Sequence, residues 1–171
     1  MSLTPNHRIA LVAGAVYVAD QVTKFLVMKY LDYAQQHIVV DGFFKFVHWG
    51  NTGAAWSMFY GNNGLLALVS ALALAVLVFS RHHFEADTWP GQIALGLIIG
   101  GILGNLTDRL IFKHVIDFLY FHIYRRGGGE LGFPAFNVAD SAICTGVGLF
   151  FLLSWRTERQ AAKDQQKTPS G

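Results

Sequence analysis

Four apolar stretches of membrane-spanning length divide this 171-residue sequence. They cover about residues 8–31, 64–80, 91–112 and 135–155. A helix needs about 20 predominantly apolar residues to cross the hydrocarbon core of a bilayer. Only 14% of the residues are charged, whereas a soluble domain has about 25%. We therefore expect a mainly α-helical membrane protein, with four transmembrane helices in a single domain over residues 1–171.

The two long connections between these stretches differ from the spans in composition. Residues 32–63 include HIVVDGFFKFVHW, which is rich in Val, Phe and Trp and is interrupted by the turn signal Asp41-Gly42. This pattern predicts short strands. Residues 113–134 join an aromatic run of interfacial character to the glycine-rich segment RGGGELGFP, which predicts a flexible loop. The C-terminal segment, residues 156–171, is polar, and we expect its end to be disordered.

The distribution of basic residues predicts the orientation. Four spans place both termini and the connection between the second and third spans on one side. On that side the basic residues are Arg8, Arg81, Arg156, Arg159, Lys163 and Lys167. On the other side they are Lys45, Lys113, Arg125 and Arg126. Cytoplasmic segments of membrane proteins carry an excess of Lys and Arg. We therefore expect cytoplasmic termini and an extracytoplasmic position for residues 32–63 and 113–134.

The first span and the connection after it contain polar residues whose role the sequence leaves open. Asp20 and Lys24, in DQVTK, are four residues apart and share a helix face, so they can pair. Such a pair either marks a membrane boundary or helps to orient a site. Asn51, in GNTGAAWSMF, either belongs to a small structural sheet or points into a site as a polar ligand.

The third span has a glycine-lined face and a polar end. Glycines recur every fourth residue from Gly96 to Gly104, a pattern that permits close helix–helix contact in a membrane. Asn105, Asp108 and Arg109 follow. Neighbouring residues on a helix do not face each other, so we expect Asp108 and Arg109 either each to find a partner elsewhere or both to lie at the membrane boundary.

Two acidic residues are expected to lie at the outer ends of the last two spans. Asp117 follows the third span, and Asp140 lies in FPAFNVADSAI at the start of the fourth. Because an outer loop joins these spans, the two carboxylates are candidates to face each other. Close carboxylates cannot both ionise easily, so one keeps a proton while the other accepts one from water. An aspartic peptidase requires this division of roles. No His or Cys accompanies them, so we expect no zinc site.

Other interpretations of these residues stay open. Lys113 lies four residues before Asp117 and could pair with it, and Asp140 could bind backbone near Asn137 at the helix start. A small membrane transporter could use the two acids as a proton or cation relay, although the chain has no internal repeat. The net charge of +2 and the lack of a basic stripe argue against a nucleic-acid partner. The single cysteine, Cys144, excludes an intramolecular disulfide.

Five sequence blocks occur in one order: DQVTK, NTGAAWS, GGILGNLTDR, HVIDF and FPAFNVADSAI. Together they resemble bacterial lipoprotein signal peptidase, or signal peptidase II, from Asp20 to about Trp155. The resemblance implies a multi-pass aspartic endopeptidase of the bacterial cytoplasmic (inner) membrane. Such an enzyme removes signal peptides from diacylglyceryl-modified prolipoproteins, cleaving before the lipidated cysteine. It also implies an active site near the outer leaflet, no metal or other cofactor, and inhibition by globomycin-like cyclic peptides.

The motifs carry this resemblance onto particular residues. The implied catalytic pair is Asp117 in HVIDF and Asp140 in NVADS. The residues implied to bind substrate or to support the site are Asn51, Asn105, Arg109, Asn137, Asp20, Lys24 and Asp108. The resemblance further implies a small extracytoplasmic β-cradle in residues 32–63. It also implies that residues 120–134 form a mobile periplasmic amphipathic helix or loop over the active site, and that membrane lipids are among the partners of the enzyme.

Overall fold

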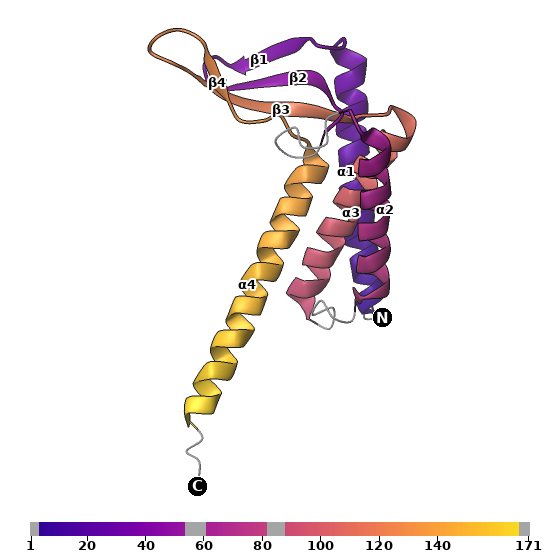
Figure 1. The fold of residues 1–171 in the computed structure, drawn as a ribbon, viewed down its shortest axis with the longest axis vertical. Coiled ribbons are helices and arrows are strands. Elements are labelled where there is room, and N and C mark those ends of the chain that lie inside the picture. The colour runs from indigo at the N-terminus through magenta and orange to yellow at the C-terminus, as the bar shows by residue number, and fades with distance from the viewer. Residues whose placement is uncertain (1–3, 54–60, 82–87, 168–171) are drawn as a thin grey trace.

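The computed structural model describes residues 4–53, 61–81 and 88–167. In chain order the elements are α1 (Pro5–Tyr30), β1 (Gln36–Val40), β2 (Phe44–Asn51), α2 (Asn63–Phe79), α3 (Trp89–Ile111), β3 (Val115–Tyr124), β4 (Glu130–Gly132) and α4 (Val138–Lys167). The sheet lies across one end of the helices, and both chain ends lie at the opposite end (Figure 1). The protein is therefore mainly helical, with one small sheet at the end remote from its termini.

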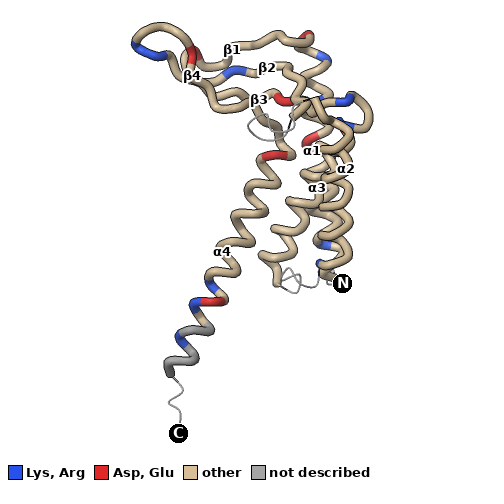
Figure 2. Tube along the Cα trace, in the orientation of Figure 1, with Lys and Arg blue, Asp and Glu red and all other residues tan. Residues whose placement is uncertain are grey.

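The helices have the length and polarity of membrane segments. Within the described residues, α1, α3 and the part of α4 up to Gln160 are long and apolar enough to cross a bilayer, and α2 is a shorter apolar helix of 17 residues. Charged residues gather near the sheet and at the far ends of the helices, while the middle of α2 and α3 carries none (Figure 2). The chain is thus a membrane protein with three long apolar helices and one shorter one.

Helices α1 and α3, which pack against each other, begin in the same way. The Thr4 hydroxyl accepts the N–H of His7 at 3.4 Å, and the Thr88 hydroxyl accepts the N–H of Gly91 at 3.1 Å. Each cap is followed by a proline in the first turn. A proline there loses no helical hydrogen bond, and its fixed φ suits the helix, so the sequence defines both helix starts locally.

Glycines let α3 approach its neighbours at backbone distance. A Cβ atom added at Gly100 would lie 2.6 Å from the carbonyl oxygen of Ala13 in α1, and one at Gly101 would lie 2.5 Å from that of Ala139 in α4. A Cβ at Gly96 would meet α1 in the same way. The close-contact face predicted from the glycine spacing is confirmed, and both α1 and α4 pack on α3.

All neighbouring strands of the sheet are antiparallel, in the order β1-β2-β3-β4. The strands predicted between residues 32 and 63 are confirmed. Of the helix or loop implied for residues 120–134, the helix is wrong, because β3 extends to Tyr124 and β4 covers Glu130–Gly132. A loop joins these two strands at residues 125–129. The sequence of β3, VIDFLYFHIY, is rich in β-branched and aromatic residues and pairs along its length with β2, so a partner distant in sequence decides its conformation.

Helix α4 differs from its predicted bounds at both ends. It starts at Val138 rather than at 135, because Phe136 forms a β-bridge with Leu119 and keeps the preceding backbone extended. It ends at Lys167 rather than near 155, so most of the polar C-terminal segment continues the helix. The residues for which disorder was predicted, 168–171, lie outside the described part of the chain.

We expect Gly100→Ala to destabilise the protein, because its Cβ would press on the backbone of α1. The loss of unfolding free energy should be about 1–3 kcal/mol, the usual cost of overpacking. Thermal unfolding in detergent, followed by tryptophan fluorescence, measures it. The control is Gly14→Ala, an exposed position on α1 with no atom within 4 Å of the added Cβ. Equal melting temperatures for the two variants would contradict the packing argument.

Candidate active site

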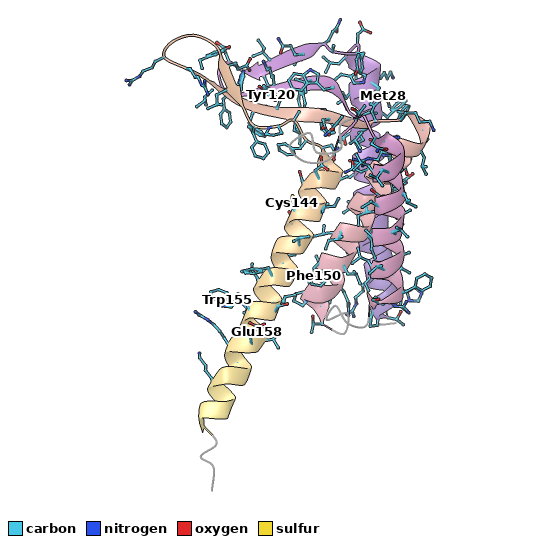
Figure 3. The ribbon with its side chains drawn as sticks, viewed as in Figure 1. Met28, Tyr120, Cys144, Phe150, Trp155 and Glu158 are labelled. Atoms are coloured by element: carbon cyan, nitrogen blue, oxygen red, sulfur yellow. The ribbon has the colours of Figure 1, made fainter. Side chains whose placement is uncertain are left out.

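The two acidic residues meet where the sheet joins the start of α4. Asp117 lies on β3 and is 3% exposed, and Asp140 is half-buried in the first turn of α4. One side chain, Asn137, bonds to both residues. Its amide nitrogen donates to Asp117 Oδ1 at 2.9 Å, and its amide oxygen accepts the backbone N–H of Asp140 at 2.9 Å. In Figure 3 this junction lies between the label of Tyr120 on the sheet and that of Cys144 on α4.

Each carboxylate also has an amide donor of its own. Asn51 Nδ2, at the end of β2, donates to Asp117 Oδ2 at 2.9 Å. Asn105 Nδ2, on α3, donates to Asp140 Oδ1 at 2.7 Å. The amide of Asn137 donates to Asn105 Oδ1 as well, at 3.2 Å, and so connects the two halves. Amide groups on three elements therefore fix the orientation of both carboxylates.

A buried ion cluster lies directly beneath these amides. The ammonium group of Lys24 contacts Asp20 Oδ2 at 2.8 Å and Asp108 Oδ2 at 2.7 Å, and it donates to Asn105 Oδ1 at 3.1 Å. All three charged residues are at most 1% exposed. The Asp20–Lys24 pair predicted from the helical spacing is confirmed, and Lys24 has a second acidic partner in Asp108.

Asp20 and Asp108 also accept hydrogen bonds from the backbone next to Asp140 and Asp117. Asp20 Oδ1 accepts the N–H of Ala139 at 2.9 Å, next to Asp140. Asp108 Oδ2 accepts the N–H of Ile116 at 3.1 Å, next to Asp117. The ion cluster therefore positions both acids through their chain neighbours.

Sequence reasoning missed two residues of this network. The side-chain amide of Gln21 donates to Asp108 Oδ1 at 3.1 Å and to Asp20 Oδ2 at 3.2 Å, and so joins two like charges. Asn63, the first residue of α2, donates to the carbonyl oxygen of Arg109 at 3.0 Å. The position of Gln21 inside DQVTK is a signal that could have been used, whereas nothing in the sequence around Asn63 distinguishes it.

Arg109 lies at the edge of the site. It is near enough to Asp117 and Asp140 for their charges to act on it, and its Nη2 donates to the carbonyl oxygen of Gly53 at 3.2 Å. No ion pair between Arg109 and a carboxylate occurs within the described ranges. With Arg109, all nine residues named from the sequence lie in one contiguous region.

The environment of Asp117 favours a retained proton. Burial raises the pKa of Asp117 to about 7, and the negative charge of Asp140 adds to the rise. Hydrogen bonds from Asn51 and Asn137 and the positive charge of Lys24 act in the opposite direction but are smaller effects. A pKa raised in this way suits a group that donates and recovers a proton.

The simpler interpretations of the two acids can now be judged. Lys113 donates to the carbonyl oxygen of Leu110 at 3.0 Å, and within the described residues it makes no ion pair with Asp117. Asp140 does bind backbone at the helix start, since its Oδ2 accepts the N–H of Asn137 at 3.3 Å. Among the described residues, no group of three or more His, Cys, Asp or Glu side chains could hold a metal ion.

Comparison with known proteins gives consistent matches over nearly the whole chain. The model of the family Signal peptidase (SPase) II matches residues 12–156. The lipoprotein signal peptidase of Geobacter sulfurreducens is 40% identical over 167 residues, which cover 94% of this chain and 99% of that protein. That of Bacillus subtilis is 31% identical over 155 residues, covering 91% and 97%.

Solved structures agree with the fold. One, described as a bacterial membrane enzyme at 2.3 Å resolution, has a TM-score of 0.73 at 26% identity and covers 95% of this chain and 93% of its own. A second, with the same description at 1.9 Å, has a TM-score of 0.71 at 29% identity and covers 85% and 90%. On the extent of the family match and the identity to these relatives, the chain belongs to the signal peptidase II family.

Proposed function

We propose that Asp117 and Asp140 are the catalytic pair with which this signal peptidase II cleaves diacylglyceryl-modified prolipoproteins before the lipidated cysteine. Family membership establishes the broader function: the chain is an aspartic peptidase of the membrane that removes signal peptides from prolipoproteins. The observation that carries the assignment of the pair is the shared Asn137, which bonds to both residues. The transporter interpretation has no comparable support.

The proposed location is the bacterial cytoplasmic membrane, with four transmembrane helices, cytoplasmic termini and the sheet outside. Two features support this orientation. The termini lie at the end of the helices opposite the sheet (Figure 1), and the greater number of basic residues lies on the side of the termini. The catalytic pair would then lie near the outer leaflet, where the lipid-bearing cysteine of a prolipoprotein is held. The site would be open to membrane lipids and to globomycin-like cyclic peptides.

The proposed reaction begins with a proton on Asp117 and a negative charge on Asp140. Asp140 removes a proton from water, and the resulting hydroxide attacks the scissile carbonyl carbon while Asp117 gives its proton to the carbonyl oxygen. The tetrahedral intermediate then collapses. Its C–N bond breaks as Asp140 passes its proton to the leaving amine of the cysteine, and Asp117 recovers a proton from the hydroxyl that becomes the new carboxyl group. Both acids end as they began.

The surrounding amides would keep the two carboxylates in a fixed orientation through this cycle. Asn51 donates to one oxygen of Asp117, and Asn105 donates to one oxygen of Asp140. The remaining lone pairs of both carboxylates are available to water and substrate. These donors come from β2 and α3. Preorganised dipoles of this kind need not reorient during the reaction, which is their main catalytic benefit.

We expect Asp117→Asn and Asp140→Asn each to lower kcat/KM by about 10²–10⁴-fold or more, because each removes a group that transfers a proton. The assay is cleavage of a purified diacylglyceryl prolipoprotein by each variant in detergent or liposomes. Asp41→Asn is a matched control, since Asp41 is exposed in the β1–β2 turn and bonds only to Tyr124 among the described contacts. A folded Asp117 or Asp140 variant that cleaves at the wild-type rate would remove that residue from the mechanism.

We expect kcat/KM to fall as pH rises through about 7, because Asp117 must be protonated and its pKa is raised to about 7 by burial. The charged groups that act on Asp117 are Asp140 and Lys24, with Arg109 close by. Asn51→Ala removes a hydrogen bond that favours the ionised carboxylate, so the alkaline limb of the profile should move to higher pH.

The measurement is a pH–rate profile of wild type and Asn51→Ala on the same lipidated substrate. The apparent pKa belongs to the coupled pair rather than to one residue. A limb that stays in place or moves to lower pH in Asn51→Ala would contradict the role given to this hydrogen bond.

A further inference from the structure

The backbone just before Asn51 is covered by two aromatic rings from distant parts of the chain. A Cβ atom added at Gly50 would lie 2.8 Å from Cδ2 of His114 and 2.9 Å from the hydroxyl oxygen of Tyr33. The centroids of these two rings are 6.1 Å apart, in an edge-to-face arrangement. The rings therefore occupy the space in which any other residue at position 50 would carry its side chain.

Each ring belongs to a residue whose chain neighbour has an unfavourable backbone conformation. Ala34 has a φ of 64° and Lys113 a φ of 67°, and within the described residues these are the only non-glycine residues with positive φ. Ala34 directly follows Tyr33, and Lys113 directly precedes His114. A left-handed conformation is costly for a residue with a Cβ atom, and such residues persist only where their surroundings require them. Both instances flank the same contact.

Further contacts hold each ring in place. The N–H of Ala34 donates to the carbonyl oxygen of His48 at 2.9 Å, and the ring of Tyr33 meets that of His48 at 5.5 Å. The Lys113 ammonium group donates to Leu110 at 3.0 Å and closes the turn between α3 and β3. The two rings thus approach Gly50 from turns that are separately fixed.

The contact bears on the active site through the next residue. Gly50 pairs with Ile116, and Asn51 pairs with Val115, at the last two positions of β2. The Asn51 amide oxygen accepts the N–H of Gly53 at 2.9 Å, which orients the amide so that its nitrogen can reach Asp117. A strand end is free to fray, so the position of Asn51 depends on what holds the residue before it.

We propose that Tyr33 and His114 are positioning residues for the peptidase reaction. Packed on Gly50, they hold the end of β2 so that the Asn51 amide faces the Asp117 carboxylate. Neither ring makes a hydrogen bond or ion pair with the acids in the described structure, so their effect passes entirely through Asn51. This inference rests on the proposed function of Asp117.

The test is a double-mutant cycle between each ring and Asn51, read as kcat/KM on the lipidated substrate. Tyr33→Ala and His114→Ala should each lower kcat/KM about fivefold to tenfold in the wild-type background, a factor typical of coupled contacts. In the Asn51→Ala background the same changes should cost less than about twofold, because the group that they position is gone. Tyr33→Ala, which adds no charge, should also move the alkaline limb of the pH profile in the same direction as Asn51→Ala.

The controls separate positioning from general damage. Tyr30→Ala removes a tyrosine three residues earlier that is 73% exposed, and it should leave kcat/KM unchanged. Because Tyr33 is itself 63% exposed, its truncation leaves the core intact. The cycle is repeated with two smaller changes. Tyr33→Phe removes only the hydroxyl over Gly50, and Gly50→Ala pushes a Cβ against both rings.

The outcomes are distinct. Losses that are equally large with and without Asn51, or a lower melting temperature with unchanged kcat/KM, would overturn the positioning role while leaving the proposed function intact. A wild-type protein that does not cleave the lipidated substrate would instead overturn the proposed function. Losses that depend on Asn51, accompanied by the shift of the pH profile, support the inference.

Discussion

The ammonium group of Lys24 is the centre from which the site is built. An isolated charge in the interior of a membrane protein is costly, so it must be surrounded by groups that compensate it. Two carboxylates and an amide do so here, from α1 and α3. Those carboxylates then accept N–H groups of α4 and β3. Four elements therefore meet around one charge, and the benefit of such a buried cluster is a fixed arrangement more than added stability.

The catalytic pair shows how this arrangement serves chemistry. The acids come from different kinds of element, Asp117 from a strand and Asp140 from a helix, and they are joined by Asn137, which is completely buried. Polar side chains immersed in a membrane protein are expensive and need partners. In this site the same amides that satisfy that need also orient the carboxylates, so stability and reactivity depend on the same hydrogen bonds.

Local patterns in the sequence were sufficient for much of this structure. The glycine face of α3 and the Asp20–Lys24 pair follow from spacing within one segment, and topology alone suggested that Asp117 and Asp140 meet. Non-local pairing was not predictable in the same way. The segment that became β3 is a short apolar run, which periodicity cannot assign to helix or strand, and its conformation depends on β2. The roles of Gln21 and Tyr33 likewise depend on residues far away in the chain.

Asp140 lies in the first turn of a membrane helix and Asp117 in the sheet at the end of that helix, so the separation of the two acids depends on how the first turn of α4 is held. Helix α4 is 30 residues long. In its first turn the N–H of Ala139 donates to Asp20. A helix adjusts to the thickness of the surrounding hydrocarbon by tilting. A change in the tilt of α4 would therefore reach the two acids through this first turn, where Ala139 is bound to Asp20 and Asp140 to Asn105.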